Sequence, residues 1–298
     1  MGMNIFIPTL GRADKQVTLR QLPDKIRSAA FLLVDYSERG NYGDIPVVVM
    51  PEETRGIGAV RQFAIDYSLD HGCTKVLMMD DDLRFFCRRM DNETLLRKAE
   101  EEDLLEMFEA IEAQLDDYPL VGVAAREGAN QTTEMMVENT RILRLLAYRA
   151  DVLRRECIRF DRVPVMEDFD VALELLKCGY KNLVLNAWAQ NQEGSGLSGG
   201  CSTYRTMEMQ GETADRMAAM HPGIVKAVEK TTKGSFGGGT RKDVVIQWKK
   251  ALGYYERNGG REKCEAERAA RDEEKRQAVI AAPADDTTLP PREQLIKE

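Results

Sequence analysis

The chain has 298 residues, of which 43% are hydrophobic and 31% are charged, and its formal net charge is −8 at pH 7. These values describe a globular chain long enough to bury a large core, and the acidic balance excludes a general affinity for nucleic acid. No stretch approaches the roughly 18 apolar residues that a membrane helix requires, so we expect no membrane partner. The N-terminus lacks a basic region followed by an apolar one, so we expect no secretory signal and a cytoplasmic location.

The six cysteines are scattered along the chain, without any Cys-x-x-Cys pair. Disulfide frameworks and zinc sites usually show closely and regularly spaced cysteines. The spacing therefore predicts reduced thiols, with neither a disulfide framework nor a zinc site.

The first part of the chain alternates short apolar runs with polar turns. Such runs predict strands buried in a sheet, and the third run is followed by apolar residues at helical spacing. Strands that alternate with helices predict an α/β fold with a mostly parallel sheet flanked by helices. The predicted strands span residues 4–9, 29–36, 45–50 and 75–79, and the predicted helix starts at Gly56.

Three adjacent carboxylates, Asp80, Asp81 and Asp82, follow the strand at 75–79. In open α/β sheets, ligands bind just beyond the carboxyl ends of the strands. Three carboxylates at one strand end repel one another unless a cation neutralises them, and a site of oxygen ligands suits Mg²⁺ or Mn²⁺. The alternative at this point is a solvated acidic turn after an ordinary strand.

Further along, the chain carries a strand at 120–125 and then an arginine-rich stretch at 140–162. Such a stretch is either a solvated face with ion pairs or a groove for a polyanion. An amphipathic helix is predicted from residue 167, and it opens with Glu167 and Asp168. Acidic residues suit the first turn of any helix, so capping alone would explain them.

Two glycine-rich segments, at 190–205 and 234–242, follow that helix and a strand at 181–188. A loop as long as the first is usually functional or mobile. The second is flanked by lysines and predicts a flexible basic loop, either a linker or a phosphate contact. We expect an α/β domain over residues 1–253, and over 254–298 a charged helix and a disordered tail.

The residues also limit the chemistry. The chain has only two histidines, His71 and His221, and neither belongs to a recognisable Ser-His-Asp or Cys-His arrangement. It has no Gly-x-x-x-x-Gly-Lys phosphate loop. A carboxylate cluster at a strand end, with a second acidic cluster about 90 residues later, favours a metal-bound diphosphate substrate and a carboxylate base.

In their order, these motifs resemble the GT-A glycosyltransferases. The resemblance rests on Ile-Pro-Thr-Leu-Gly-Arg at the first strand, Asp35, Gly-Ala-Val-Arg ending at Arg61, the three aspartates, and Glu167-Asp168. Finer details are similar to the TET-associated glycosyltransferases that phages encode beside oxygenases acting on DNA pyrimidines. These details are Met-Asp-Asp-Asp-Leu at 79–83, Phe-Asp at 160–161 ahead of Met-Glu-Asp-Phe-Asp at 166–170, and Gly-Gly-Cys-Ser-x-Tyr-Arg at 199–205. The resemblance covers roughly residues 3–250.

The resemblance implies a GT-A-type, Rossmann-like fold, a UDP-sugar donor and a divalent metal ion. Asp168 matches the base that takes the proton of the acceptor hydroxyl, with inversion at the anomeric carbon, and Glu167 would contact the acceptor or orient Asp168. Asp82 would bind the metal, with His221 as a further candidate ligand. The residues implied in donor binding are Pro8, Thr9, Arg12, Asp35, Arg61, Asp80 and Asp81.

The acceptor implied by the family is 5-hydroxymethylcytosine in DNA, and a phage-encoded enzyme would act in the host cytoplasm. A base in duplex DNA must be extruded for such chemistry. Arg154, Arg155, Tyr204 and Arg205 are then the candidate acceptor or DNA contacts. The alternatives are a GT-A enzyme with a protein or polysaccharide acceptor, and a nucleotide-sugar-binding protein without catalysis.

Overall fold

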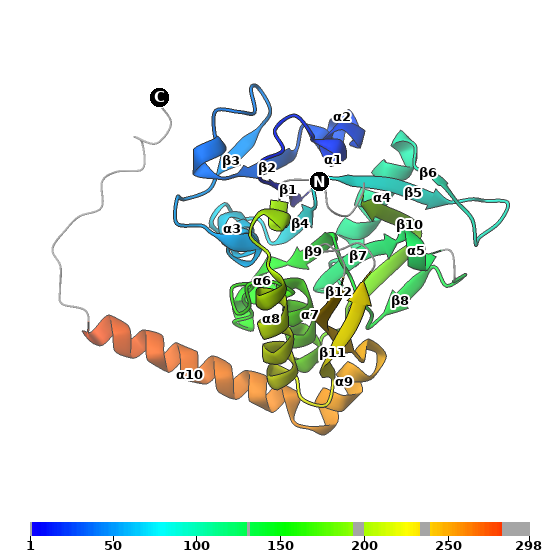
Figure 1. The fold of residues 1–298 in the computed structure, drawn as a ribbon. Helices are drawn as coiled ribbons and strands as arrows, with labels where there is room; N and C mark the ends of the chain where they lie inside the picture. The colour runs from blue at the N-terminus through cyan, green and yellow to red at the C-terminus, as the bar shows by residue number, and fades with distance from the viewer. Residues whose placement is uncertain (1, 130–131, 193–199, 233–238, 282–298) are drawn as a thin grey trace.

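The computed structural model describes residues 2–129, 132–192, 200–232 and 239–281 (Figure 1). Four apolar runs form the parallel part of the sheet, in the order β3-β2-β1-β4. They confirm the first four strands predicted from the sequence. The bounds are β1 (Met3–Thr9), β2 (Ala30–Val34), β3 (Val47–Val49) and β4 (Lys75–Met79).

The sheet continues beyond β4 as β9-β7-β10-β5-β6, with β8 also paired to β10. β9 runs antiparallel to both β4 and β7, while β7 and β10 are parallel, so the sheet is mixed. The predicted α/β class is confirmed, whereas β5, β6, β8 and β9 were not predicted. The bounds are β5 (Leu83–Arg88), β6 (Leu96–Lys98), β7 (Leu120–Ala125), β8 (Met136–Glu138), β9 (Leu145–Arg149) and β10 (Leu183–Gln192).

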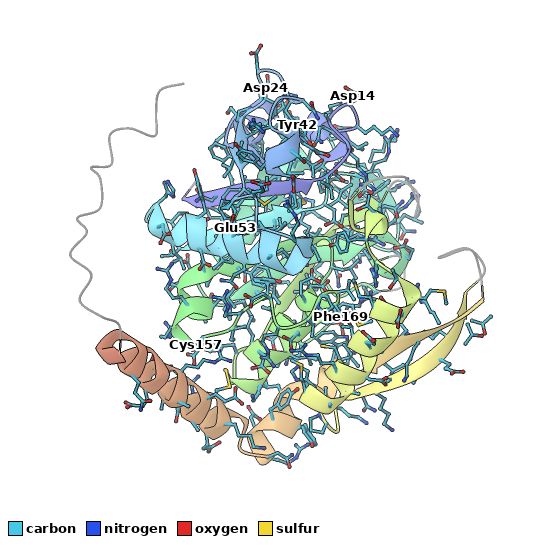
Figure 2. The ribbon with its side chains drawn as sticks, turned by 60° about the vertical axis from the view of Figure 1, so that its left-hand side comes forward. Asp14, Asp24, Tyr42, Glu53, Cys157 and Phe169 are labelled. Carbon is cyan, nitrogen blue, oxygen red and sulfur yellow. A yellow bond between two sulfur atoms is a disulfide. The ribbon has the colours of Figure 1, made fainter. Side chains whose placement is uncertain are left out.

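Helices cover both faces of the sheet, and side chains fill the space between the layers (Figure 2). Because strand side chains alternate, Phe6 and Met78 face one layer of helices while Ile5 and Leu77 face the other. The first layer holds α3 (Gly56–Asp70), α6 (Ala150–Arg155) and α7 (Glu167–Lys177). The second holds α1 (Val17–Gln21), α2 (Asp24–Arg27) and α4 (Glu101–Gln114); the remaining short elements are α5 (Arg126–Ala129), η1 (Tyr36–Glu38) and η2 (Gly200–Thr203).

A smaller unit packs on the second side of α7. Val171 and Leu175 of that helix join the core beneath the sheet, whereas Leu173 and Leu176 pack with the later elements. These are α8 (Met207–Met220), a two-stranded ribbon of β11 (Val225–Thr232) and β12 (Gly239–Ile246), and α9 (Trp248–Arg257). The predicted flexible basic loop at 234–242 is therefore wrong for residues 239–242, which begin a strand, and its earlier part lies outside the described residues.

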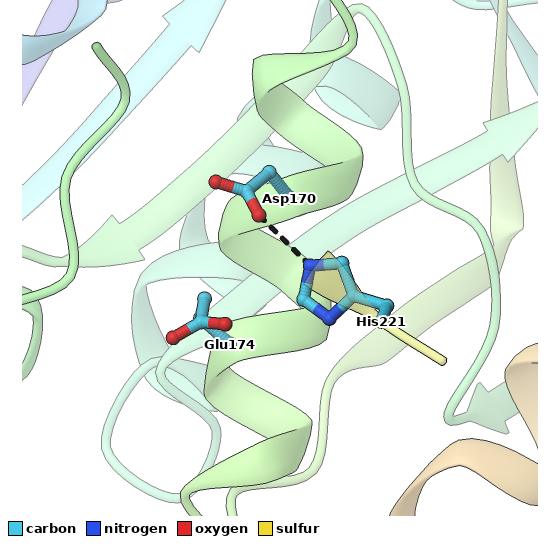
Figure 3. Close-up of side chains that lie close together, drawn as sticks. All are labelled: Asp170, Glu174 and His221. Carbon is cyan, nitrogen blue, oxygen red and sulfur yellow. Dashed lines mark hydrogen bonds and ion pairs between the residues drawn. The ribbon is translucent and has the colours of Figure 1, made fainter. Parts of the chain in front are cut away.

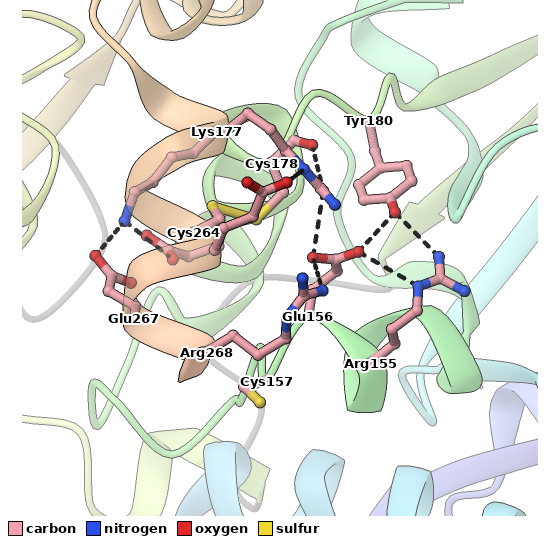
Figure 4. The surroundings of a disulfide bond; sticks show 12 residues. Arg155, Glu156, Cys157, Lys177, Cys178, Tyr180, Cys264, Glu267 and Arg268 are labelled. Atoms are coloured by element: carbon pink, nitrogen blue, oxygen red, sulfur yellow. Dashed lines mark hydrogen bonds and ion pairs between the residues drawn. A yellow bond between two sulfur atoms is a disulfide. The ribbon is translucent and has the colours of Figure 1, made fainter. Parts of the chain in front are cut away.

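The last helix, α10 (Gly260–Ala281), is fastened to the body by a disulfide between Cys178 and Cys264 (Figure 4). The prediction of reduced thiols is wrong for this pair, because the two cysteines are 86 positions apart and their spacing along the chain gives no sign of their contact. Arg261 and Arg268 of α10 also reach the buried carboxylate of Glu156. The division of the chain at 253 stays a prediction, and the predicted disordered tail lies mostly outside the described residues.

Within the described part of the chain, none of the helices combines the length and the apolarity needed to cross a bilayer.

Candidate active site

The carboxyl ends of three parallel strands bring predicted site residues to one edge of the sheet. Thr9 ends β1, Asp35 follows β2, and Asp80 follows β4. Asp35 is fixed by the backbone N–H and hydroxyl of Ser37 and by Arg55, whose guanidinium lies 2.9 Å away. The Ser37 hydrogen bonds hold the pKa of Asp35 below its ordinary value. The carboxylate at the end of β2 is therefore ionised and can accept a hydrogen bond.

Thr18, which was not predicted as a site residue, shapes the turn that carries the three aspartates. Its hydroxyl donates to the carbonyl oxygen of Asp80 (2.6 Å) and accepts from the backbone N–H of Leu83 (2.8 Å). Its own N–H donates to the carbonyl oxygen of Asp81 at 3.0 Å. Because Thr18 is fully buried, these bonds are shielded from water and fix the direction in which the carboxylates point.

Asp81 holds its neighbours in place and has both oxygen atoms engaged. Oδ2 accepts from the Thr9 hydroxyl at 2.8 Å, and Oδ1 accepts from Arg12 at 2.6 Å. Gln16 donates in turn to the Thr9 hydroxyl at 2.9 Å. Asp81 is buried, so these contacts make it the residue that positions Thr9 and Arg12.

Asp82 and Asp80 are the carboxylates of this turn that could bind a ligand. Asp82 Oδ2 accepts from Gln192 (3.0 Å) and Arg12 (3.1 Å), whereas its buried Oδ1 has no hydrogen-bond partner among the described residues. The Asp80 side chain is 34% exposed. Burial, together with the charges of Asp82 and Asp81, raises the pKa of Asp80 to about 7 against the opposing charge of Arg61. The carboxylates of Asp80 and Asp82 repel each other, and a divalent cation, which prefers oxygen ligands, would relieve this repulsion.

Arg61 links this turn to the second acidic cluster. Its guanidinium lies 2.6 Å from Glu167 Oε1 and 3.8 Å from Asp80 Oδ1, and it is buried. Burial alone would lower the pKa of Arg61, but the charges of Glu167, Asp168 and Asp80 raise it above its ordinary value. One permanent cation therefore stands between the carboxylates of β4 and those of α7.

Gly58 allows this contact. A Cβ at Gly58 would lie 2.7 Å from the carbonyl oxygen of Phe160, closer than side chains approach backbone. The start of α3 can thus pack directly on the segment that leads into α7, which brings Arg61 to Glu167. Gly56 serves the turn at the helix start, where its φ is +80°, and Gly58 serves the close approach to Phe160.

The backbone before α7 is strained. Met166, the residue preceding Glu167, has φ 62°, and Arg144, whose carbonyl oxygen accepts from the N–H of Asp80, has φ 66°. Left-handed backbone at non-glycine residues costs free energy and is often found at functional sites.

Burial raises the pKa of Glu167 to about 7, an effect that the charge of Asp168 increases and the charge of Arg61 opposes. The buried hydroxyl of Tyr148, also within electrostatic range of Arg61 and Asp168, has no partner among the described residues.

The predicted acceptor residues from the glycine-rich segment also reach this region. The Tyr204 hydroxyl accepts from the N–H of Ile57, at the start of the helix that carries Arg61. Arg205 is close enough to Glu167 to lower its pKa and donates to Gln210 at 2.9 Å. Gly200 packs over the guanidinium of Arg12, its N–H donating to the carbonyl oxygen of Leu10. Residues 193–199 of this segment lie outside the described structure.

His221 belongs to a different cluster (Figure 3). Its Nε2 lies 2.8 Å from Asp170 Oδ1 and its Nδ1 lies 2.8 Å from the Tyr255 hydroxyl, so both ring nitrogens are engaged. Ligand atoms of Asp170, Glu174 and His221 lie within 4.8 Å of one another, as around a metal ion, but Arg162 already pairs with both carboxylates. These contacts anchor α7 to α8 and α9, and they do not support His221 as a ligand beside Asp82.

The structure does not bring Arg154 and Arg155 to the aspartate turn. They lie on α6, which follows the end of β9, and that end pairs with Lys75 at the start of β4. The aspartates follow the opposite end of β4. Arg154 pairs with Asp70 and Arg155 contacts Glu156 and Tyr180, so both serve the ion-paired surface that was the alternative interpretation of this stretch.

Comparison with known proteins gives the class of the chain: it is a glycosyltransferase. The family model that matches, over residues 3–200, is that of the TET-associated glycosyltransferases, and the chain belongs to this family. The resemblance drawn from the sequence motifs is thereby confirmed. No curated protein matches the chain.

The chain also has low similarity to a number of solved structures, of which two follow. A mannosyltransferase from Pyrobaculum calidifontis in complex with GDP-mannose and Mn²⁺ matches with 12% identity and a TM-score of 0.46, covering 72% of this chain and 61% of that one. A mannose-1-phosphate geranyltransferase from Thermus thermophilus matches with 13% identity and a TM-score of 0.34, covering 52% of this chain and 61% of that one. The chain thus spans about three fifths of each, and likeness of this degree carries no argument about its chemistry.

Proposed function

We propose that this glycosyltransferase moves a sugar from a UDP-sugar to the hydroxymethyl group of 5-hydroxymethylcytosine in DNA, with a divalent cation, Mn²⁺ or Mg²⁺, and with inversion at the anomeric carbon. Membership of the TET-associated family supports the DNA acceptor. The observation that carries the mechanism is the position of Arg61 between Asp80 and Glu167, which joins the strand-end carboxylates to the start of α7. We also propose that residues 1–253 form the catalytic domain.

The donor would bind along the edge formed by β1, β2 and β4. Asp35 would accept a hydrogen bond from the uracil base, and Pro8, Thr9 and Arg12 would line the nucleotide pocket. Asp82 would hold the cation through its Oδ1, which has no hydrogen-bond partner among the described residues, and Asp80 would bind the ribose or sugar side of the donor. When bound, such an ion neutralises the diphosphate that leaves.

Asp168 would then accept the proton of the acceptor hydroxyl. As that proton leaves, the hydroxymethyl oxygen forms its bond to the anomeric carbon, and the bond from that carbon to the phosphate oxygen breaks on the opposite face. The positive charge of Arg61 would stabilise the negative charge that develops in the site as these bonds change, and its ion pair with Glu167 keeps the guanidinium in place. Tyr204 would stack on a nucleobase and Arg205 would contact a phosphate.

The test is transfer from a panel of UDP-sugars to duplex and single-stranded DNA that contains 5-hydroxymethylcytosine, with Mn²⁺ or with a chelator. Nucleoside mass spectrometry reads the products. A metal-dependent mass gain on the modified cytosine, absent from unmodified DNA, is the expected result. Hydrolysis of a UDP-sugar without any transfer to DNA would contradict the acceptor and would favour a protein or polysaccharide instead.

A further inference from the structure

Two arginines at the candidate site differ from the other cations around it. Arg141 and Arg144 have no carboxylate within ion-pair distance among the residues that the structure describes. Within the described part of the chain the Arg144 side chain donates to Gln190, at 3.4 Å, and it lies close enough to Asp80 to lower the pKa of that carboxylate. By contrast, Arg12 and Arg61 are each fixed by carboxylates. A guanidinium left without a protein carboxylate beside a site is suited to bind an anion of the substrate.

Arg141 is held in place without an ion pair. Its guanidinium carbon lies 4.8 Å from the centre of the Phe169 ring, and Phe169 in turn packs edge-on against Trp248, with the ring centres 5.7 Å apart. Phe169 directly follows Asp168, and Trp248 begins α9. The cation–π contact with Phe169, a ring that Trp248 holds in place, restricts the side chain of Arg141, which remains exposed to solvent. An arginine held in this way loses little entropy when it binds a ligand.

The surroundings of Arg141 place it on the side of Asp168 and of the ribbon. Enough protein surrounds Arg141 to lower its pKa, while the charges of Asp168 and Asp243 oppose that change. Asp243 lies on β12 and pairs with Lys230 (3.4 Å) and Arg241 (3.1 Å) of the ribbon. Lys230 and Arg241 therefore pair with Asp243, and Arg141 lies within electrostatic range of that same carboxylate and of Asp168.

We propose that Arg141, held over the ring of Phe169, binds a backbone phosphate of the acceptor strand beside the nucleotide that receives the sugar. The inference rests on the proposed function and names the residue that holds the acceptor. Phosphate of the donor is the other source of the same chemistry. The acceptor strand is favoured because Arg12, Arg61 and Arg144 already lie near the donor carboxylates, Asp80 to Asp82. Arg141 instead lies over Phe169 on α7, within electrostatic range of Asp168 and of Asp243 on the ribbon.

The experiment measures binding of a fluorescent duplex with one 5-hydroxymethylcytosine to the full chain, at several salt concentrations, by anisotropy. For Arg141→Gln we expect a Kd higher by roughly five- to tenfold and a salt slope smaller by about 0.7–0.9, the loss of one phosphate contact. Arg141→Lys should recover part of the affinity because it keeps the charge but lacks the stacked plane. UDP binding in the presence of Mn²⁺, measured by calorimetry, should stay within about twofold of wild type.

Arg257→Gln is the matched control, since it removes the same charge from the far end of α9, roughly 13 Å along the helix from Trp248. A loss of UDP affinity in Arg141→Gln, with DNA affinity retained, would assign Arg141 to the donor and overturn the inference. Equal DNA affinity of wild type and Arg141→Gln would overturn it as well, with the proposed function untouched. Failure of the wild type itself to bind DNA would instead overturn both.

Discussion

Arg61 donates a 2.6 Å hydrogen bond to Glu167, and both side chains are buried. The two residues are 106 positions apart, one on the helix before β4 and one at the start of α7. Because the same guanidinium also lies 3.8 Å from Asp80, this pair fixes the distance between the proposed donor and acceptor halves of the site. The proposed catalytic geometry therefore depends on this buried ion pair.

The first prediction concerns the stability of that pair. Arg61→Met and Glu167→Met each take from a buried charge its closest partner of opposite sign, which costs about 3–5 kcal/mol in free energy of unfolding. The double variant should lose less than the sum of the two, because it leaves neither charge alone. Urea unfolding of the four proteins measures this coupling. Additive losses would show that Arg61 and Glu167 do not depend on each other.

The second prediction concerns the base. In Asp168→Asn the amide cannot accept the proton of the acceptor, so kcat for transfer should fall by roughly 10²- to 10⁴-fold. Donor binding should remain close to wild type, since Asp168 lies at α7 and not among the strand-end carboxylates. Asp116→Asn, which changes an exposed aspartate paired with Lys75, is the control. Near-normal turnover of Asp168→Asn would disprove this role.

The third prediction concerns Thr18. In Thr18→Val the shape is kept, but the hydroxyl that joins Asp80 to Leu83 is lost, and the buried partners stay unsatisfied. We expect a loss of about 1–3 kcal/mol in stability and a raised KM for the donor. Thr18→Ser retains the hydroxyl and should recover donor binding. If Val and Ser variants show the same KM, Thr18 contributes only to packing.

The fourth prediction concerns the disulfide between Cys178 and Cys264. Because it closes a long loop and holds α10 on α7, its reduction should lower stability by about 2–4 kcal/mol. Unfolding with and without a reductant measures this, and peptide mapping under non-reducing conditions identifies the bond. Cys264→Ala should behave like the reduced protein. Cys157→Ala, at a free cysteine, should still respond to the reductant.

Much of the parallel half of the sheet could be predicted, because its strands are continuous apolar runs. The position of Asp80 to Asp82 followed from the rule that ligands bind at strand ends, and the start of α7 followed from helical spacing. β9 was hidden within the arginine-rich stretch, although its residues Leu145 to Tyr148 are buried. A short strand among charged residues does not differ from a loop by periodicity alone.

Side-chain partners distant in sequence were beyond prediction. Thr18 is an ordinary threonine until β4 brings the aspartate turn against α1, and Gln192 meets Asp82 only because β10 and β5 pair. A run of charges does not show where each charge lies. Composition suits Arg154 and Arg155 to DNA, whereas the fold places them away from the aspartate turn and places Arg141 over Phe169, the neighbour of Asp168. Composition gives the number of charges, and only the fold says which of them lack a partner.

The last prediction concerns pH and the aspartate turn. The pKa of Asp80 is raised from 3.8 to about 7, so the folded protein holds a proton on this residue that the unfolded chain releases. Between those values the folded state binds more protons, and Asp80 therefore lowers stability as pH rises through this window. Asp80→Asn removes the effect. With metal ions removed by a chelator, the free energy of unfolding of the variant should match that of wild type near pH 4.5 and exceed it by about 1–2 kcal/mol at pH 8. The figure is reduced because the side chain is a third exposed.

The gain in stability of Asp80→Asn should come with loss of sugar transfer, as expected where function maintains a cluster of repelling charges. Urea unfolding across this pH range measures the difference, and a difference that does not change with pH would show that Asp80 ionises normally in the folded protein.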